Sequence, residues 1–273
     1  MDRGNYVWFL SRVLRKHVRQ PLMGIFSRFF GRRREEMLPP IDLSSLKVDM
    51  HSHLIPGIDD GSRSMDESIA MLAKFESLGY KKVITTPHIM GDFYKNTPEL
   101  ILGGLEDVRK TASKLGLKIE IEAAAEYYFD ESLMDRLVRK EQLLTFGDNQ
   151  VLFEFSMMTK PDQIDQLLFE LLTQNYKPVL AHFERYTFFF GSVDKAIEWR
   201  EKGIDIQLNL NSLVGHYGPD VKRQAERLVD SGAIDFVASD CHRMDHLMIM
   251  EGNLHLPYFH KVMDLDLKNS ALA

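Results

Sequence analysis

The stretch Leu46-Lys47-Val48-Asp49-Met50-His51-Ser52-His53 is a strand-like, largely apolar run that ends in two histidines one residue apart. Side chains alternate between the two faces of a strand, so His51 and His53 point to the same side. Two imidazoles held side by side at a strand end can bind one metal ion together. The alternative is a pair of ordinary core or surface histidines, and the rest of the chain decides between the two interpretations.

Beyond this stretch the chain alternates strand-like and helix-like segments. Ser64 to Glu67 has the form of a capping box, and Thr97-Pro98 offers an N-cap followed by proline at the first helical position. The predicted strands are 46–50, 82–87, 118–125, 150–155, 177–182, 204–211 and 234–239, and the predicted helices are 64–79, 97–116, 161–174, 192–202 and 220–231. Such alternation predicts parallel strands joined by helical crossovers. Seven units favour a distorted (β/α)7 TIM-like barrel, with an open doubly wound α/β sheet as the alternative.

Six of the seven predicted strands have a histidine or an acid at or just beyond the carboxyl end. In a parallel barrel these ends form one face, where active sites are assembled. Nine side chains are expected to converge there: His51, His53, Asp60, His88, Glu126, Glu154, His182, Asp240 and His242. Any one of them alone is more simply an ordinary hydrogen-bonded loop or core residue. Together they would place several carboxylates face to face unless cations neutralise them.

Nine ligands are too many for one ion and fit two or three. All of them are imidazoles or carboxylates, a set that suits manganese, iron or zinc and does not select among them.

The composition narrows the class of protein. A chain of 273 residues with 44% hydrophobic content can bury a sizeable core. The net charge of −6 disfavours nucleic acid as a partner. A single cysteine excludes an internal disulfide, which fits a reducing, cytoplasmic location. The apolar runs are too short for a transmembrane helix.

The first 34 residues differ from the rest in charge. They hold nine arginines and lysines against one acid, a net charge of +8 that leaves −14 on the other 239 residues. Aromatic and aliphatic residues lie between the arginines. We therefore predict a basic amphipathic arm over residues 1–45, followed by a catalytic domain over 46–273. Such an arm can lie on an anionic membrane surface; a disordered arm, or a helix packed on the domain or on a second subunit, is the alternative.

The order of the motifs resembles the polymerase-and-histidinol-phosphatase (PHP) domain, and within it the bacterial metal-dependent protein-tyrosine phosphatases of capsule and exopolysaccharide operons. The resemblance covers roughly residues 47–250 and rests on His51-Ser52-His53, Gly57-Ile58-Asp59-Asp60-Gly61, Thr86-Pro87-His88, Ala125-Glu126-Tyr127-Tyr128, Glu154-Phe155-Ser156, His182-Phe183-Glu184-Arg185-Tyr186 and Ser239-Asp240-Cys241-His242. It implies a distorted (β/α)7 barrel with three divalent ions, in the first place manganese.

The resemblance also implies a role for each ligand. His51, His53, Glu126 and Asp240 would hold the first ion. Glu126 would bridge to a second ion completed by Glu154 and His182, and the third ion would be held by Asp60, His88 and His242. Arg185 matches the phosphate-binding arginine of the family. A second arginine is expected downstream, and Arg243 is the candidate for that role.

The predicted chemistry is hydrolysis of phosphotyrosine by a metal-bound hydroxide, without a phosphoenzyme. The partner implied by the resemblance is the tyrosine-rich tail of a bacterial tyrosine kinase that controls polysaccharide export. The aromatic residues Tyr127, Tyr128, Phe183 and Tyr186 are candidates for the lining of the site opening, or else for ordinary packing.

Three other functions remain as alternatives: a small-molecule phosphatase such as histidinol phosphatase, a membrane-docked regulatory module, and a PHP nuclease. Cysteine-based phosphatase chemistry is rejected because it needs Cys-x5-Arg, and the residue six positions after Cys241 is Leu247.

Overall fold

The strands lie in two parallel sheets in the computed structural model, which describes residues 38–273. The smaller sheet has the order β1 (Val48–Asp49), β2 (Lys82–Thr85) and β4 (Glu120–Ala123). The larger sheet has the order β3 (His88–Ile89), β5 (Glu126–Tyr128), β6 (Gln150–Glu154), β7 (Lys177–Leu180), β8 (Asp205–Asn209) and β9 (Phe236–Ala238). The prediction of a mixed α/β fold with parallel strands is thereby confirmed, and all seven predicted strands are present.

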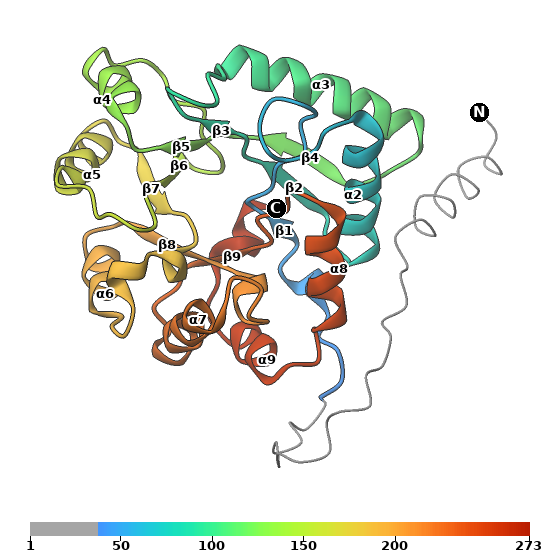
Figure 1. Ribbon diagram of the computed structural model, residues 1–273. Helices are drawn as coiled ribbons and strands as arrows, with labels where there is room; N and C mark the ends of the chain where they lie inside the picture. Colours follow the sequence, from blue (N-terminus) through green and yellow to red (C-terminus); the bar gives the residue numbers. More distant parts are fainter. Residues whose placement is uncertain (1–37) are drawn as a thin grey trace. The chain divides into compact units, whose positions relative to one another are not determined.

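Helices surround the strands (Figure 1). They are α2 (Met65–Ser77), α3 (Pro98–Lys114), α4 (Glu131–Val138), α5 (Ile164–Thr173), α6 (Asp194–Glu201), α7 (Pro219–Ser231), α8 (Met244–Gly252) and α9 (Pro257–Met263). Short 3-10 helices lie at η1 (Leu43–Ser45), η2 (Phe183–Arg185), η3 (Thr187–Phe189), η4 (Leu210–Ser212) and η5 (Lys268–Leu272). The predicted caps are confirmed: Ser64 Oγ accepts from Glu67 N at 3.3 Å, and Thr97 Oγ1 accepts from Leu100 N at 3.3 Å.

Residues Pro39–Ala273 form one compact unit. The predicted basic arm lies almost entirely outside the described residues. Over residues 38–273, no helix combines the length and the hydrophobicity that a membrane crossing requires.

The edges of the two sheets meet where β1 and β9 end. Ser52 and Cys241 form a parallel bridge, and His53 N donates to the carbonyl oxygen of Cys241 at 2.9 Å. Asp240 N donates to the carbonyl oxygen of His51 at 3.0 Å. The segment that carries the two paired histidines therefore lies directly beside the segment that carries Asp240.

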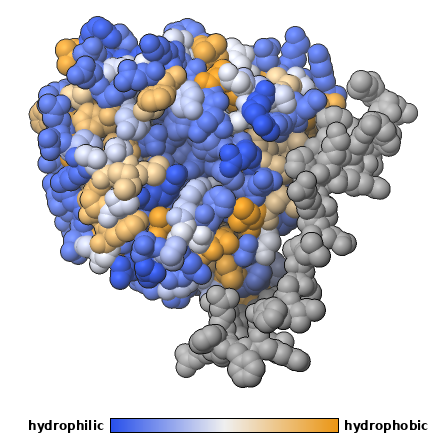
Figure 2. Space-filling model, viewed as in Figure 1, coloured by the Kyte–Doolittle hydropathy of each residue, from blue (hydrophilic) through white to orange (hydrophobic). Residues whose placement is uncertain are grey.

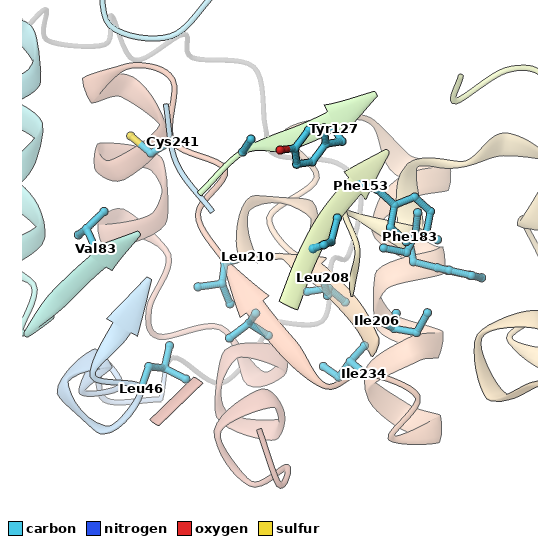
Figure 3. Close-up of a cluster of buried hydrophobic side chains, with 14 of the residues drawn as sticks. Leu46, Val83, Tyr127, Phe153, Phe183, Ile206, Leu208, Leu210, Ile234 and Cys241 are labelled. Atoms are coloured by element: carbon cyan, nitrogen blue, oxygen red, sulfur yellow. The ribbon is translucent and has the colours of Figure 1, made fainter. Parts of the chain in front are cut away.

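Strand β6 shows how one strand builds both the core and the site. Its side chains are buried on both faces, as is usual in a parallel sheet covered by helices. Phe153 packs in the larger apolar cluster together with Ile206 and Leu208 of β8 (Figure 3). Leu152 packs on the opposite face, in a smaller inner cluster made of Val48, Met50, Ile84, Ala124, Phe146, Leu152, Val179, Ala181, Phe236, Ala238 and Leu272. Since side chains alternate, Glu154 lies on the same face as Leu152.

The surface seen in the view of Figure 1 is mostly hydrophilic, with apolar residues in small groups between polar ones (Figure 2). Phe153 is 0% exposed, whereas Phe169 on α5 is 63% exposed. The apolar side chains that stabilise the fold are therefore those of the strands and of the inward faces of the helices.

The replacement Phe153→Ala is expected to lower the free energy of unfolding by about 3–5 kcal/mol, because it leaves a cavity in a close-packed core. Phe169→Ala is the matched control, and the expected change there is within about 0.5 kcal/mol. Urea denaturation followed by circular dichroism measures both. Equal effects of the two substitutions would contradict the placement of Phe153 in the core.

Candidate metal centre

Strand register carries three of the predicted residues to one face of the larger sheet. His88 pairs with Glu126, and Glu126 pairs with Leu152, whose side chain belongs to the inner cluster. Paired residues of neighbouring strands point to the same side of the sheet. His88, Glu126 and Glu154 therefore all face the region above the inner cluster. Glu154 ends β6, whereas His88 and Glu126 begin the short strands β3 and β5, which follow β2 and β4 in the chain.

Four side chains surround one point beside this face. The Nε2 atoms of His51 and His53 are 3.3 Å apart. Glu126 Oε2 lies 3.2 Å from His51 Nε2 and 3.4 Å from His53 Nε2. Asp240 Oδ1 lies 3.3 Å and 3.6 Å from the same two nitrogens. All four residues are at most 2% exposed, so these donor atoms face one another in a buried part of the cluster.

A second group of ligand atoms shares Glu126. Its Oε1 atom is 3.2 Å from His182 Nε2, which is also 3.5 Å from Glu154 Oε2. His88 Nδ1 lies 3.1 Å from Glu126 Oε2 and 3.3 Å from Glu154 Oε1. Glu126 therefore contacts four histidines and lies at the centre of the cluster.

A third group lies nearer to solvent. Asp60 Oδ1 is 3.4 Å from His88 Nε2 and 3.4 Å from His242 Nε2. The rings of His53 and His242 stack with centroids 3.9 Å apart. The resemblance groups His88 with Asp60 and His242. In the structure the ring of His88 lies between Asp60 on one side and the pair Glu126 and Glu154 on the other.

All nine predicted ligands thus come together in one cluster. Three sets offer donor atoms within 4.8 Å of one another: His53, Asp60, His88 and His242; His51, His53 and Glu126; and His88, Glu126 and Glu154. The structure therefore has histidine and carboxylate groups that fit metal ions, in line with the predicted chemistry of the ligands.

The geometry of the closest contacts fits ligands better than hydrogen bonds. Glu126 Oε2 and His88 Nδ1 are buried and 3.1 Å apart, yet neither makes an aligned hydrogen bond within residues 38–273. An unpaired buried polar atom is unfavourable unless something else satisfies it. The Nε2 atoms of His51 and His53 also face each other, and when both imidazoles are neutral and carry their proton on Nδ1, the two Nε2 lone pairs would repel. Divalent cations, for which nitrogen and oxygen are suitable ligands, satisfy all these atoms.

The charges of the cluster are strongly coupled. Burial lowers the pKa of His51, but the carboxylates of Glu126 and Asp240 outweigh burial and raise it to about 9. Burial raises the pKa of Glu126, and the neighbouring His51 and His88 overcome it and hold that pKa well below its usual range. Metal binding requires neutral imidazoles, so ions and protons compete for this site.

Two of the predicted ligands have a left-handed backbone conformation two residues after the ends of β7 and β9. His182 has φ 34° and Asp240 has φ 48°, values that non-glycine residues seldom adopt. His182 N donates to the side-chain oxygen of Gln207 at 2.8 Å, and this bond helps to hold the turn. Strained backbone of this kind concentrates at functional sites.

Residues outside the predicted set orient the histidines. Asp59 Oδ2 lies 2.8 Å from His53 Nδ1 and accepts a hydrogen bond from His88 N at 3.2 Å. Gln207 Oε1 lies 3.2 Å from His51 Nδ1. A partner on the second ring nitrogen fixes the tautomer of a ligating histidine. The sequence signals were an acid next to Asp60 and a glutamine within an apolar strand.

The replacement Asp59→Asn is expected to weaken Mn²⁺ binding by roughly 10–100-fold, because the carboxylate that orients His53 loses its charge. Isothermal titration calorimetry measures the affinity. Asp66→Asn, in the exposed first turn of α2, is the matched control. Unchanged affinity in Asp59→Asn would argue against a positioning role.

The two predicted arginines lie in different surroundings. Arg185, in η2, donates from Nη1 to Asp240 Oδ2 at 3.2 Å, so it borders the cluster directly. The guanidinium of Arg243 lies 3.4 Å from His246 Nε2, and His246 Nδ1 lies 3.2 Å from the carbonyl oxygen of Asp240. Arg243 is therefore connected to the cluster through His246.

The four aromatic residues considered for the lining of the site opening also lie in different surroundings. Tyr127, Phe183 and Tyr186 are at most 1% exposed and belong to the larger apolar cluster, so of the two alternatives the structure favours ordinary packing for these three. Tyr127 pairs with Phe153 and therefore faces away from Glu126. Tyr128 is partly exposed and lies one residue further along, on the face of Glu126.

Comparison with known proteins identifies the family that the chain matches. The model of the family described as "Capsular polysaccharide synthesis, CpsB/CapC" matches residues 47–248. The tyrosine-protein phosphatase YwqE of Bacillus subtilis (strain 168) is 31% identical over 198 residues, which cover 72% of this chain and 78% of that protein. The tyrosine-protein phosphatase CpsB of Streptococcus pneumoniae is 29% identical over 204 residues, with coverages of 72% and 84%.

A solved structure leads to the same family. It comes from a study of YwqE from Bacillus subtilis and CpsB from Streptococcus pneumoniae, described as unique metal-dependent tyrosine phosphatases. It matches with a TM-score of 0.70 and 26% identity, and covers 82% of this chain and 93% of the other. The resemblance drawn from the motifs is confirmed: this chain belongs to the CpsB/CapC family.

Proposed function

We propose that this protein is a metal-dependent phosphatase that hydrolyses phosphotyrosine in a protein. One observation carries the proposal: nine histidines and acids converge in one cluster that Arg185 borders, in a chain whose relatives are named tyrosine-protein phosphatases. The family matched is one of capsular polysaccharide synthesis, so the proposed substrate is the tyrosine-rich tail of a bacterial tyrosine kinase of that system.

The proposed ligands divide among three ions, with manganese first and iron or zinc as alternatives. His51, His53, Glu126 and Asp240 would hold one ion, Glu126, Glu154 and His182 a second, and Asp60, His88 and His242 a third. When bound, the ions lower the pKa of coordinated water and fix the phosphate oxygens for in-line attack. The three sets of donor atoms within 4.8 Å support a site for more than one ion.

The chain's own residues supply the remaining functions. Arg185 is proposed to neutralise charge on the phosphoryl oxygens, and the position of its guanidinium beside Asp240 supports this role. Asp59 and Gln207 keep the Nδ1 atoms of His53 and His51 occupied, so that the Nε2 atoms point inward. A phenolate with an ordinary pKa of about 10 leaves more readily than an alkoxide, so strong acid assistance is not required.

The single cysteine fits this chemistry and not a cysteine-based one. Cys241 is fully buried, and burial raises the pKa of its thiol well above the usual range. A thiol in these surroundings is a poor nucleophile. Its sulfur packs 3.6 Å from the sulfur of Met71, as expected for a small filler between two ligands.

Substrate preference is the experiment that tests the proposed function. The Mn-loaded protein is expected to release phosphate from a phosphotyrosyl peptide with a higher kcat/KM than from histidinol phosphate. A clear preference for histidinol phosphate would assign a small-molecule phosphatase instead, and turnover of neither would favour a regulatory module. Release of nucleotides from DNA would identify a nuclease.

We also propose that the two sheets are parts of one distorted (β/α)7 barrel. The bridge between Ser52 and Cys241, which joins the ends of β1 and β9, supports this arrangement. In the proposed division of the chain, the barrel spans residues 46–273 and is preceded by the arm of residues 1–45.

The proposed location is the cytoplasm, with the arm in contact with the inner face of the membrane through residues 1–34. The net charge of +8 on those residues, interleaved with aromatic side chains, supports attraction to anionic lipids. Co-sedimentation of the full chain with anionic vesicles, beside a chain lacking residues 1–40, tests this. Only the full chain is expected to pellet, and equal behaviour of the two would defeat the proposal.

A further inference from the structure

We propose that Tyr217 is a positioning residue for Arg185, and that it holds the guanidinium ready for the phosphate group of the substrate. The inference rests on the proposed function in that it takes Arg185 as the phosphate-binding arginine. It goes beyond that function by naming the residue that fixes the arginine.

The guanidinium of Arg185 is held between two groups. Its Cζ atom lies 4.4 Å from the centre of the Tyr217 ring, within the range of a cation–π interaction. Its Nη1 atom donates to Asp240 Oδ2 at 3.2 Å. The arginine side chain is 22% exposed, so one part of it still faces solvent.

Tyr217 is itself fixed to the metal cluster. Its hydroxyl accepts a hydrogen bond from Asn209 Nδ2 at 3.0 Å. The same nitrogen donates to Asp240 Oδ2 at 3.0 Å, the oxygen that also accepts from Arg185. A closed ring of contacts thus joins Arg185, Asp240, Asn209 and Tyr217. Within it, Arg185 and Asn209 donate to the same carboxylate oxygen of Asp240, and Asn209 also donates to the hydroxyl of Tyr217.

The base of this ring is buried and hydrogen-bonded. Asn209 is 0% exposed at the end of β8, and its backbone N donates to Glu184 Oε1 at 3.0 Å. Glu184 is the residue before Arg185 and also accepts from Ser212 Oγ at 2.6 Å. The short helix that carries Arg185 and the strand end that holds Tyr217 are therefore tied together through two buried polar residues.

Most N–H donors of Arg185 remain available to a phosphate group. A guanidinium has five N–H donors, and among the described residues its one hydrogen bond is to Asp240. The aromatic face of Tyr217 restrains the group without occupying those donors. An arginine restrained in this way before the substrate arrives loses less conformational freedom on binding a phosphate.

Binding of inorganic phosphate to the Mn-loaded protein, measured by calorimetry, tests the proposal without requiring turnover. Tyr217→Leu is expected to raise the Kd for phosphate by roughly twofold to thirtyfold, the range of a cation–π interaction. Tyr217→Phe keeps the ring and is expected to stay nearer to the wild type. Tyr217→Met carries the same expectation as Tyr217→Leu and replaces it if the leucine variant does not fold.

The decisive comparison is made in the background of Arg185→Ala. If Tyr217 acts through the arginine, Tyr217→Leu has no further effect there. Equal effects in both backgrounds, or no effect of Tyr217→Leu in the wild type, would overturn the proposal. So would a wild-type protein that does not bind phosphate. The Mn²⁺ content of each variant is measured alongside and is expected to stay at the wild-type value.

A matched control is available at Tyr258. Its ring lies 4.3 Å from Lys261 Nζ and its hydroxyl donates to Asp230 at 2.9 Å, so it makes the same two kinds of contact away from the cluster. Tyr258→Leu is expected to leave phosphate binding unchanged. Phosphate binding with the predicted coupling but no hydrolysis of phosphotyrosine would defeat the proposed function and leave the role of Tyr217 intact.

Discussion

The replacement Glu126→Gln is expected to lower the rate of phosphate release from a phosphotyrosyl peptide by on the order of a thousandfold or more. Glu126 is 1% exposed, and its two oxygens lie within 3.4 Å of nitrogens of His51, His53, His88 and His182. Glutamine keeps the size of the side chain but removes the negative charge and turns one oxygen into a donor. The centre of the proposed site would then lose the carboxylate that the proposed division of ligands assigns to two ions.

Steady-state kinetics at saturating Mn²⁺ measure the effect, together with the metal content of each protein. The matched control is Glu122→Gln on β4, the strand that precedes β5 in the chain, where the carboxylate pairs with Lys82 at 2.9 Å. The control is expected to keep the wild-type rate. Activity of Glu126→Gln within tenfold of the wild type would contradict the central place given to this residue.

The replacement Arg185→Ala is expected to lower kcat/KM by roughly 10²–10³-fold, the usual effect of removing one group that stabilises transition-state charge. The residue is placed beside Asp240 by η2 and retains N–H donors for a phosphoryl group. Arg185→Lys is expected to recover only part of the activity, because an ammonium lacks the planar fork that binds two oxygens at once.

The same kinetics, with phosphate as a competing ligand, measure this effect. Arg139→Ala serves as the control, because the guanidinium of Arg139 pairs with Glu141 and its side chain is 60% exposed. Equal kcat/KM in Arg185→Ala and in the wild type would show that the phosphate is bound by other groups.

Much of the fold and the cluster could be predicted from the sequence because the signals are local. The pair His51 and His53 and the acids and histidines at the ends of later strands each sit at a position that the strand pattern defines. A parallel α/β arrangement then brings those ends together without further information. The seven predicted strands and the two predicted caps follow from the same local rules.

Other features depend on register and on contacts between distant segments. The two-residue strand β3 is too short to show a pattern, and Tyr127 is buried only because its partner in the ladder is Phe153. Asp59 and Gln207 gain their roles from the second nitrogens of His53 and His51. Tyr217 is 32 residues after Arg185 in the chain, and no spacing rule links the two.

In the proposed function, hydrolysis depends on metal ions held by this cluster. The most direct test is phosphate release from a phosphotyrosyl peptide by metal-stripped protein, with Mn²⁺ added back, beside the variant His182→Ala. We predict no turnover in the stripped protein, restored turnover with Mn²⁺, and little restoration in the variant, because His182 contacts both Glu126 and Glu154. Full activity of the stripped protein, or a variant that Mn²⁺ restores to the wild-type rate, would contradict the account.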